Sequence, residues 1–250
     1  MGLHAFSRTE RVIGTENLEK LKNSKVAIFG IGGVGTYVAE GLARSGVGSF
    51  VLVDDDDVCL TNINRQIHAL RSTVGRAKVE LMKERILDIN PNAIVETKKM
   101  LYTSETAKDL LRDDYDYVVD AIDMVSSKLD LVERCFHRGM NMISSMGAGN
   151  KLDPTQFEVT DIYKTSICPL AKVMRKELRK RGVKKLKVVY SREESIKPKV
   201  VNADCKADCI STNEDRTQIS KRQVPGSMAF VPSVAGLIIA SVVVRDIINM

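Results

Sequence analysis

Short apolar runs alternate with longer amphipathic segments along the first 150 residues of the chain. Each run is rich in large apolar residues and is bounded by turn-forming residues, as is typical of buried strands. A chain that alternates strands with helices builds a parallel sheet covered by helices on both faces. We therefore predict an α/β fold with a Rossmann-like, doubly wound and mostly parallel sheet. Its strands are expected near residues 25–29, 50–53, 93–97, 116–121 and 141–145.

The pattern changes after the turn-forming run SSMGAGN at residues 144–150. The strand-like segments QFEVTDI and KVVYS bracket a basic helix. We expect this helix to begin near Pro169 and to end near Gly182, because proline favours the first turn of a helix and glycine the position just past its end. The apolar positions predicted to form its inner face are Leu170, Val173, Met174 and Leu178.

Two segments near the C-terminus complete the outline. Residues 211–226 are polar and turn-rich, which predicts a flexible crossover loop. The uncharged run from Ala229 to Val244 is shorter than a membrane helix requires, and we predict a buried helix packed on the sheet. We therefore predict a first domain, residues 1–150, and a C-terminal extension, residues 151–250, that carries the basic helix.

A glycine-rich loop follows the first predicted strand. Glycine permits a tight turn and lets backbone N–H groups approach a phosphate at the N-terminus of the next helix, here about residues 34–45. About 20 residues further on, the second strand ends in Asp54, where a nucleotide site places a carboxylate for ribose hydroxyls. This order of strand, loop, helix and acidic residue favours a nucleotide site over an ordinary tight turn. The glycines are Gly30, Gly32, Gly33 and Gly35.

Cationic and amide side chains follow Asp54, which favours chemistry at phosphorus over hydride transfer. Displacement at a phosphorus needs positive groups that offset the charge on the leaving pyrophosphate. Arg65 is one such group and Lys78 is a second, although Lys78 alone would be interpreted as a solvated position of an amphipathic helix. The other polar residues of this stretch are Asp56, Asn62 and Gln66.

Four separated motifs give the chain a family resemblance. They are GxGGxG at residues 30–35, DxDxVxxxNxxRQ at 54–66, VGxxK at 74–78 and DAID at 120–123. Over about residues 6–150 the chain resembles the ubiquitin-activating-like (ThiF/MoeB/HesA) adenylyltransferase superfamily. The details most similar to its branch of tRNA threonylcarbamoyladenosine dehydratases are NRQIHAL at 64–70, Lys128 after DAID, and DPTQFEVTDIYKT at 153–165.

The resemblance implies an ATP-dependent, ligase-type enzyme that releases AMP and pyrophosphate. Asp123 would hold a magnesium ion, and Arg65 and Lys78 would stabilise the departing pyrophosphate. The carboxylate of threonylcarbamoyladenosine in a tRNA would be adenylated and then captured by the substrate's own carbamoyl group, with net loss of water. The residues it implies for ATP are Gly30, Gly32, Gly33, Gly35, Asp54, Asp56, Asn62, Arg65, Gln66 and Lys78.

An arginine near the N-terminus completes the phosphate site in this family, where it reaches across a dimer interface. Both Arg8 and Arg11 in FSRTERVIG can be aligned with it, and we favour Arg11. The resemblance therefore implies a homodimer in which Arg11 is a further catalytic residue. A sulfur-relay protein is a candidate partner.

The positive charge of the chain is concentrated in one segment. Residues 172–199 hold 12 Lys or Arg and 3 Glu, a net charge of +9, whereas the whole chain carries +6. A solvated helix face commonly explains such a run. With an RNA substrate implied by the resemblance, phosphate contact becomes the better interpretation.

The five cysteines are odd in number and scattered, which favours reduced thiols and a cytoplasmic location, and the N-terminal 24 residues are polar and charged. Cys205 and Cys209 do not form the two CxxC pairs of a structural zinc site, so we expect no zinc. Cys168 is interpreted as a buried, inert thiol. We assign His68 to local structure beside the nucleotide site.

Two other functions share parts of this pattern. An adenylyltransferase that activates the C-terminus of a ubiquitin-like sulfur-carrier protein would use the same nucleotide residues, but the CxxC pairs of such relatives are missing. A noncatalytic nucleotide-binding module would not need Arg65, Lys78 and Asp123 together. Analysis of the reaction product distinguishes the three.

Overall fold

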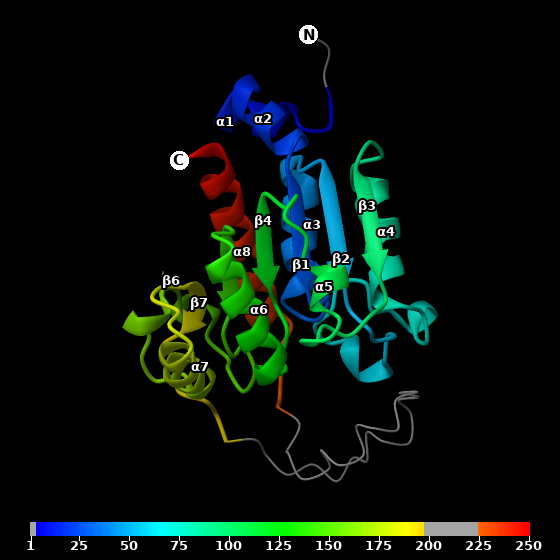
Figure 1. Cartoon of the computed structure of the whole chain (residues 1–250). Coiled ribbons are helices and arrows are strands. Elements are labelled where there is room, and N and C mark those ends of the chain that lie inside the picture. Colours follow the sequence, from blue (N-terminus) through cyan, green and yellow to red (C-terminus); the bar gives the residue numbers. More distant parts are fainter. Residues whose placement is uncertain (1–3, 198–224) are drawn as a thin grey trace.

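The structure is a computed structural model that describes residues 4–197 and 225–250. A seven-stranded sheet runs through it in the order β3-β2-β1-β4-β5-β7-β6 (Figure 1). The paired strands are parallel except for β6 and β7. The predicted Rossmann-like sheet is confirmed. The strands are β1 Lys25–Phe29, β2 Ser49–Val53, β3 Ile94–Lys98, β4 Tyr117–Asp120, β5 Met142–Ser145, β6 Phe157–Asp161 and β7 Lys187–Ser191.

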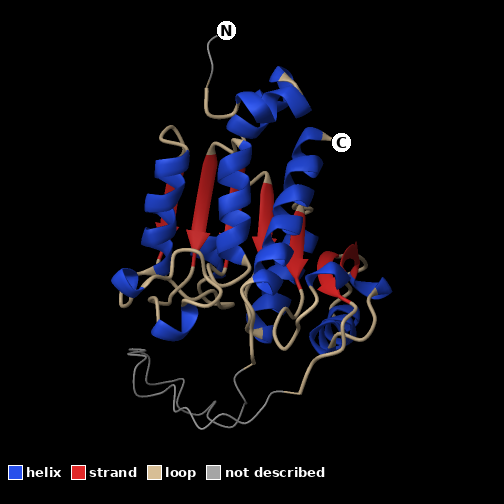
Figure 2. Cartoon of the chain, turned by 180° about the vertical axis from the view of Figure 1, so that it is seen from behind, coloured by secondary structure: helices blue, strands red, loops and turns tan. Residues whose placement is uncertain are grey.

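Helices cover both faces of this sheet (Figure 2). The α-helices are α1 Ser7–Ile13, α2 Thr15–Lys22, α3 Gly35–Ser45, α4 Lys78–Ile89, α5 Ala107–Leu110, α6 Val125–His137, α7 Pro169–Lys180 and α8 Phe230–Ile248. Short 3-10 turns are η1 Leu60–Asn62, η2 Arg71–Thr73, η3 Pro154–Gln156 and η4 Ile162–Lys164.

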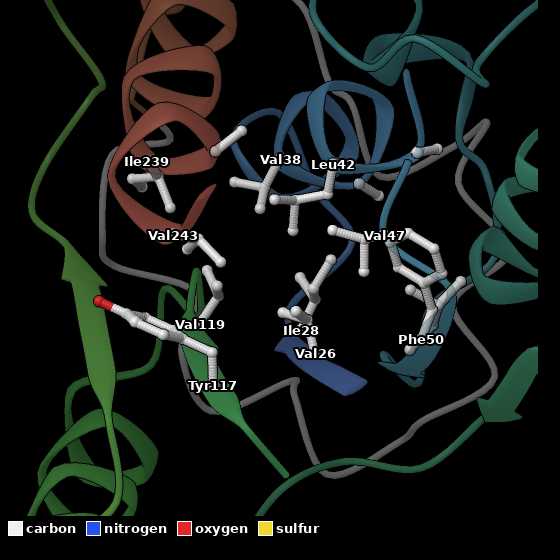
Figure 3. Close-up of a cluster of buried hydrophobic side chains, with 14 of the residues drawn as sticks. Val26, Ile28, Val38, Leu42, Val47, Phe50, Tyr117, Val119, Ile239 and Val243 are labelled. Atoms are coloured by element: carbon white, nitrogen blue, oxygen red, sulfur yellow. The ribbon is translucent and has the colours of Figure 1, made fainter. Parts of the chain in front are cut away.

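Successive side chains of the central strands point to opposite faces of the sheet, so the hydrophobic core has two parts. Val26 and Ile28 of β1 point to the face covered by α3, α4 and α8 (Figure 3), whereas Ala27 and Phe29 point to the face covered by α5 and α6. Side chains that alternate in this way are typical of a strand buried on both faces, and they explain why β1 reads as a continuous apolar run.

Helix α8 packs against α3. A Cβ atom at Gly236 would lie 2.5 Å from the carbonyl oxygen of Val34, so the two helices approach at backbone distance. The predicted buried helix is thus confirmed. The run was expected to be too short for a membrane helix, and this is wrong for the helix that contains it. Helix α8 extends to Ile248, and its 19 residues, with a mean hydropathy of 1.9, are long and apolar enough to cross a membrane. Half of the apolar stretch of α8 is buried inside the protein.

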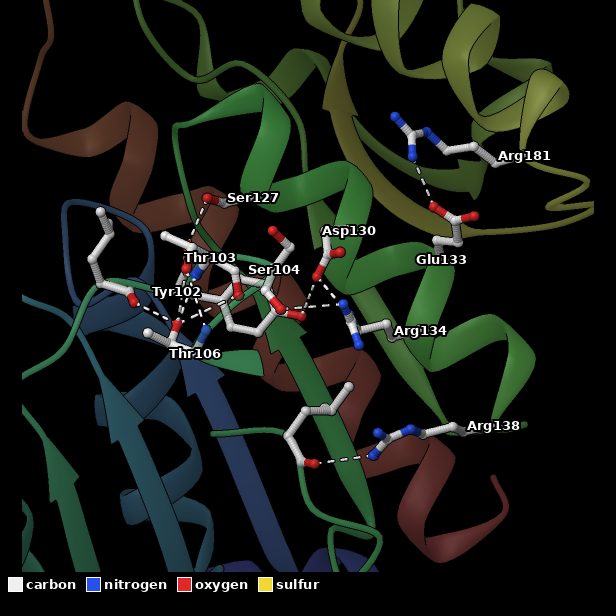
Figure 4. Close-up of polar contacts among 12 residues, drawn as sticks. Tyr102, Thr103, Ser104, Thr106, Ser127, Asp130, Glu133, Arg134, Arg138 and Arg181 are labelled. Atoms are coloured by element: carbon white, nitrogen blue, oxygen red, sulfur yellow. Dashed lines mark hydrogen bonds and ion pairs between the residues drawn. The ribbon is translucent and has the colours of Figure 1, made fainter. Parts of the chain in front are cut away.

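The C-terminal extension continues the first sheet, because β7 pairs with β5. Helix α7 packs beside α6, and Arg181 just after it is 2.8 Å from Glu133 of α6 (Figure 4). Met174 and Leu178 of α7 are buried as predicted, but Val173 is 45% exposed. Ala171 takes the inward position instead, since the spacing 171, 174, 178 keeps one helix face. The predicted loop at 211–226 lies outside the described residues, apart from its last two.

The order of the strands identifies the edge of the sheet at which a ligand is expected to bind. The chain moves from β1 outward to β2 and β3, and then returns to β4 on the other side of β1. Ligands of doubly wound sheets bind at the carboxyl ends of the strands beside such a reversal. The loops after β1, β2 and β4 meet at this edge, which is the lower edge in Figure 1.

Candidate active site

The glycine loop turns tightly between β1 and α3. A Cβ atom at Gly30, where φ is 92°, would lie 2.6 Å from the carbonyl oxygen of Ala121, and one at Gly35 would lie 1.8 Å from that of Gly30. Larger residues do not fit there. Within the part of the chain that the structure describes, the N–H groups of residues 32–35 have no hydrogen-bond partner. They are therefore available to an anion at the N-terminus of α3.

Asp54 ties the end of β2 to this loop. Its Oδ2 accepts a hydrogen bond from the Ile31 N–H at 2.6 Å, and its Oδ1 accepts one from the Asp56 N–H at 2.9 Å. Burial raises the pKa of Asp54, and the nearby charge of Lys78 opposes this rise. A carboxylate offers about four acceptor sites, so Asp54 keeps capacity for ribose hydroxyls.

His68 contacts the carbonyl group of the same residue, Ile31. Its Nε2 lies 3.3 Å from the Ile31 carbonyl oxygen, and the residue is 5% exposed. Burial lowers the pKa of His68 to about 4. The ring is therefore neutral near neutral pH and donates through Nε2–H, in agreement with its predicted structural role.

Lys78 begins α4 and is only 5% exposed, so the alternative of a solvated position is wrong. Its Nζ lies 2.7 Å from Asp56 Oδ2 and 3.7 Å from Asp54 Oδ1. A buried ammonium needs such partners. The three residues that the sequence placed at the nucleotide are thus in direct contact.

The segment that carries Arg65 is shaped by Asn62. The side-chain Oδ1 of Asn62 accepts a hydrogen bond from the Cys59 N–H at 2.9 Å. The backbone carbonyl of Asn62 accepts hydrogen bonds from the N–H groups of Arg65 and Gln66, each at 3.0 Å. Asn62 and Gln66 are both buried. Their positions support a role in holding the loop that presents Arg65.

Arg65 lies near enough to Asp123 for their charges to interact. Its Nη1 donates to the Thr61 carbonyl at 2.8 Å, and its Cγ would lie 3.4 Å from a Cβ atom at Gly33. Burial lowers the pKa of Arg65, and the charge of Asp123 opposes that shift. Asp123 itself is exposed, just past the end of β4. The structure therefore brings the DxDxVxxxNxxRQ and DAID motifs together.

Asp120 and Lys128 form a buried ion pair near Asp123. Both residues belong to the motifs of the sequence, but neither was predicted as a site residue. Lys128 Nζ lies 2.8 Å from Asp120 Oδ2 and donates to the Ile122 carbonyl at 3.1 Å, while Asp120 Oδ1 accepts the Ile122 N–H at 3.1 Å. Ser144 donates to Asp120 at 2.6 Å. The pair thus holds the residue that precedes Asp123. Lys128 follows the first aspartate of DAID by eight residues and lies in the first turn of α6, a spacing that does not by itself predict the contact.

Replacement of Lys128 is expected to destabilise the fold strongly. Asp120 and Lys128 are both 0% exposed, so Lys128→Met would leave a buried carboxylate without its counter-ion. This typically costs about 3 to 5 kcal/mol of unfolding free energy. Urea unfolding of Lys128→Met should show the loss, and the double variant with Asp120→Asn should recover much of it. An equal loss in Lys108→Met, at an exposed lysine, would contradict the assignment.

Arg8 and Arg11 are not at this site within one chain. Both are exposed on α1, which lies at the opposite end of the sheet, beyond the amino ends of the strands (Figure 1). A cavity of about 630 Å³ also lies at that end, between α2 and the end of α8, and is lined in part by Glu19, Asp116 and Asp246. It borders none of the predicted site residues.

Cys135 and Cys168 lie outside the site. Cys135 and Cys168 are free and buried, as expected for reduced thiols, whereas Cys59 is disulfide-bonded, so the prediction is wrong at that position. Cys168 precedes α7 and packs in the cluster beneath it. Cys205 and Cys209 lie outside the described residues.

The basic segment forms an exposed surface on α7 and the turn after it. Lys180 is 2.8 Å from Glu177, and Arg179 lies over the ring of Tyr163 at 5.1 Å. A shallow groove of about 370 Å³ runs between Tyr163 and the turn. Four lysines of α7 and the turn after it are exposed and have no ion pair within the described part of the chain: Lys172, Lys176, Lys184 and Lys185.

Comparison with known proteins identifies the family of this chain. The model of the ThiF family matches residues 6–250. This chain belongs to the ThiF family. This ThiF family member is 52% identical over 249 residues to the tRNA threonylcarbamoyladenosine dehydratase of Bacillus subtilis, across 99% of this chain and 96% of that protein. The resemblance stated from the motifs is confirmed.

Two further comparisons concern the dehydratase of Escherichia coli, one by sequence and one by structure. The dehydratase of that organism is 44% identical to this ThiF family member over 174 residues, across 70% of this chain and 65% of that protein. A solved structure of the E. coli enzyme, TcdA, in complex with ATP superposes with a TM-score of 0.85 and 34% identity, across 98% of this chain and 94% of that one.

Proposed function

We infer that this protein is an ATP-dependent tRNA threonylcarbamoyladenosine dehydratase. The observation that carries this inference is the 52% identity to the B. subtilis dehydratase along almost the whole of both chains. The site is consistent with it, because a glycine loop, a ribose-type carboxylate and two cations lie at one edge of the sheet.

ATP is proposed to bind with its phosphates against the free N–H groups of residues 32–35 and its ribose on Asp54. Lys78 is then close to the phosphates. In the structure its charge is balanced by Asp54 and Asp56, at 3.7 and 2.7 Å. A bound phosphate would share that ammonium.

The first chemical step is proposed to be attack of the substrate carboxylate on the α-phosphorus. The bond from this phosphorus to the pyrophosphate oxygen breaks, and pyrophosphate carries away the electron pair. Arg65 and Lys78 are placed to stabilise that negative charge, which grows in the transition state. The products are an acyl-adenylate on the tRNA base and free pyrophosphate.

The second step is intramolecular. A nucleophile of the substrate's carbamoyl group attacks the activated carbonyl carbon, AMP leaves, and the ring closes with overall loss of water from the substrate. Both reacting groups are on one base, so proximity lowers the barrier without a protein nucleophile. This agrees with Cys168 being buried away from solvent.

Magnesium is proposed to be held by Asp123. This carboxylate is exposed at the carboxyl end of β4 and has no hydrogen bond within the described residues, and oxygen ligands suit this ion. When bound there, the ion would neutralise phosphate charge. The neighbouring group Asp54, Asp55 and Asp56 is less suited, since Asp56 is paired with Lys78 and Asp54 bonds two backbone N–H groups.

We propose that the two parts of the chain divide the work. Residues 1–150 would carry out adenylation, and residues 151–250 would hold the tRNA through the lysines of α7 and the following turn. The protein would act in the cytoplasm, where tRNA is available. A sulfur-relay protein is kept as a candidate partner, and co-purification from cells would test it.

A homodimer with shared sites is proposed because α1 cannot reach its own chain's glycine loop. A two-fold interface exchanges equivalent surfaces, so each α1 would supply Arg11 to the partner's site. Mixing inactive Arg11→Ala with inactive Asp123→Ala subunits should restore about a quarter of parent activity, the share of sites in which both residues are intact after random exchange. A mixture that stays inactive after proven subunit exchange would assign the role to Arg8 or remove it from α1.

The direct test of function is mass analysis of nucleosides from substrate tRNA incubated with the protein, ATP and magnesium. We expect threonylcarbamoyladenosine to be replaced by a product lighter by one water, with AMP formed in equal amount. If pyrophosphate forms only when a ubiquitin-like carrier protein is supplied, the sulfur-carrier alternative is correct. If nucleotide binds and no pyrophosphate forms with either, the protein is a noncatalytic module.

A further inference from the structure

Asn150 joins the two described ends of the chain that flank residues 198–224. Its carbonyl oxygen accepts the Ile196 N–H at 2.8 Å, its N–H donates to the Gly226 carbonyl at 2.8 Å, and its Oδ1 accepts the Gly226 N–H at 2.6 Å. Its φ of 57° lies in the left-handed region, which asparagine tolerates better than most residues. All three bonds therefore depend on one strained position.

The segment that Asn150 anchors reaches the active site through Asn64. The Asn64 Nδ2 donates to the Ser227 carbonyl at 2.9 Å, and its Oδ1 accepts a hydrogen bond from Arg65 Nη1 at 3.0 Å. The orientation of this amide is determined, because a carbonyl cannot donate and a guanidinium cannot accept. Asn64 is thus a bridge between the C-terminal segment and the arginine of the nucleotide site.

Arg65 is also confined by packing on the same side. A Cβ atom at Gly33 of the glycine loop would lie 3.2 Å from Pro232 of α8 and 3.4 Å from Arg65 Cγ. The arginine stem therefore lies close to both the glycine loop and the start of α8. Its Nη1 is held by two acceptors, the carbonyl of Thr61 and Oδ1 of Asn64. Arginine has five N–H donors, so others are left for a phosphate.

We propose that Asn64 is a positioning residue for Arg65, and that residues 225–228, anchored on Asn150, determine where Asn64 lies. The proposal rests on the proposed function, in which Arg65 stabilises pyrophosphate. It makes adenylation depend on the C-terminal extension, which also carries the proposed tRNA surface. A guanidinium held by two acceptors presents its remaining donors in one orientation, as transition-state stabilisation requires.

The test is a double-mutant cycle on the rate of ATP–pyrophosphate exchange with substrate tRNA. Asn64→Ala should lower kcat about 10-fold and change the KM for ATP by less than about 3-fold, since a positioned contact acts in the transition state. In an Arg65→Ala background, the same change should lower the residual rate by less than about 2-fold, because its target is gone.

Two further variants separate positioning from general loss of structure. Asn150→Gly keeps the left-handed backbone and removes Oδ1, so it should lower kcat, and its effect should not add to that of Asn64→Ala. Asn141→Ala, which removes a side-chain bond to the Asp116 carbonyl at the far edge of the sheet, should leave kcat unchanged.

Equal losses from Asn64→Ala in the parent and Arg65→Ala backgrounds would overturn the proposal. A rise in the KM for ATP without a fall in kcat would overturn it as well. If the parent protein forms no AMP with substrate tRNA, it is the proposed function that fails. The two failures are therefore distinguishable.

Discussion

Arg65→Ala and Asp123→Ala are each expected to lower the rate of adenylation by a factor of about 100 to 1,000 while the fold stays intact. Both residues are asked to act on phosphate charge and not on packing. Arg65 is partly buried at the edge of the glycine loop, and Asp123 is exposed just past β4. ATP–pyrophosphate exchange with substrate tRNA present measures the effect, and thermal unfolding checks the fold.

Matched surface residues provide the controls for these two variants. Arg71→Ala and Asp109→Ala remove an exposed arginine and an exposed aspartate outside the site, and should leave exchange within about 2-fold of the parent. Near-normal exchange in Arg65→Ala or Asp123→Ala would remove that residue from the mechanism. A drop in all four variants would show instead that exchange responds to general charge.

Much of the fold was predictable because its signals are local. An apolar run bounded by turn residues needs no partner to be recognised, and each of the five strands predicted before residue 150 lies within two residues of its observed bounds. The glycine loop was predictable for the same reason. Gly30 and Gly35 are required by close backbone approach, which leaves a direct trace in the sequence.

Other features depend on contacts between distant segments. Whether Val173 or Ala171 faces inward depends on how α7 is rotated against α6, and both choices fit a helical repeat. Lys128 is exposed or buried according to whether Asp120 lies beside it, and no spacing rule decides that. The bridge from Asn150 through Ser227 to Asn64 spans residues far apart in sequence, so the pattern of each segment alone gave no sign of it.

The placement of α1 shows the same limit at the level of assembly. The sequence aligned Arg8 and Arg11 with a phosphate-binding arginine, and one chain alone keeps both at the wrong end of the sheet. A residue that acts on another subunit is not identifiable from its own chain's contacts. For this reason the mixed-subunit experiment is more informative about α1 than either single variant.

Charge reversal on α7 and its following turn is expected to weaken tRNA binding by about 100-fold or more at low salt. The positions are those without ion pairs in the described structure, Lys172, Lys176, Lys184 and Lys185, each changed to Glu. Lys180 is left unchanged, because it already pairs with Glu177 and so contributes less to a phosphate. ATP binding should change little, since the glycine loop belongs to the first part of the chain.

The salt dependence of binding identifies the contacts as phosphate contacts. Each lost contact removes about 0.7 to 0.9 from the logarithmic salt slope, so four should remove about 3. A control with the same charge change elsewhere, Lys20, Lys22, Lys83 and Lys108 to Glu, tests net charge alone. If both quadruple variants lose the same affinity, only net charge matters, and the tRNA surface lies elsewhere. If only the first loses affinity and slope together, the basic surface of α7 binds tRNA phosphates, because a solvated helix face would release no counter-ions on binding.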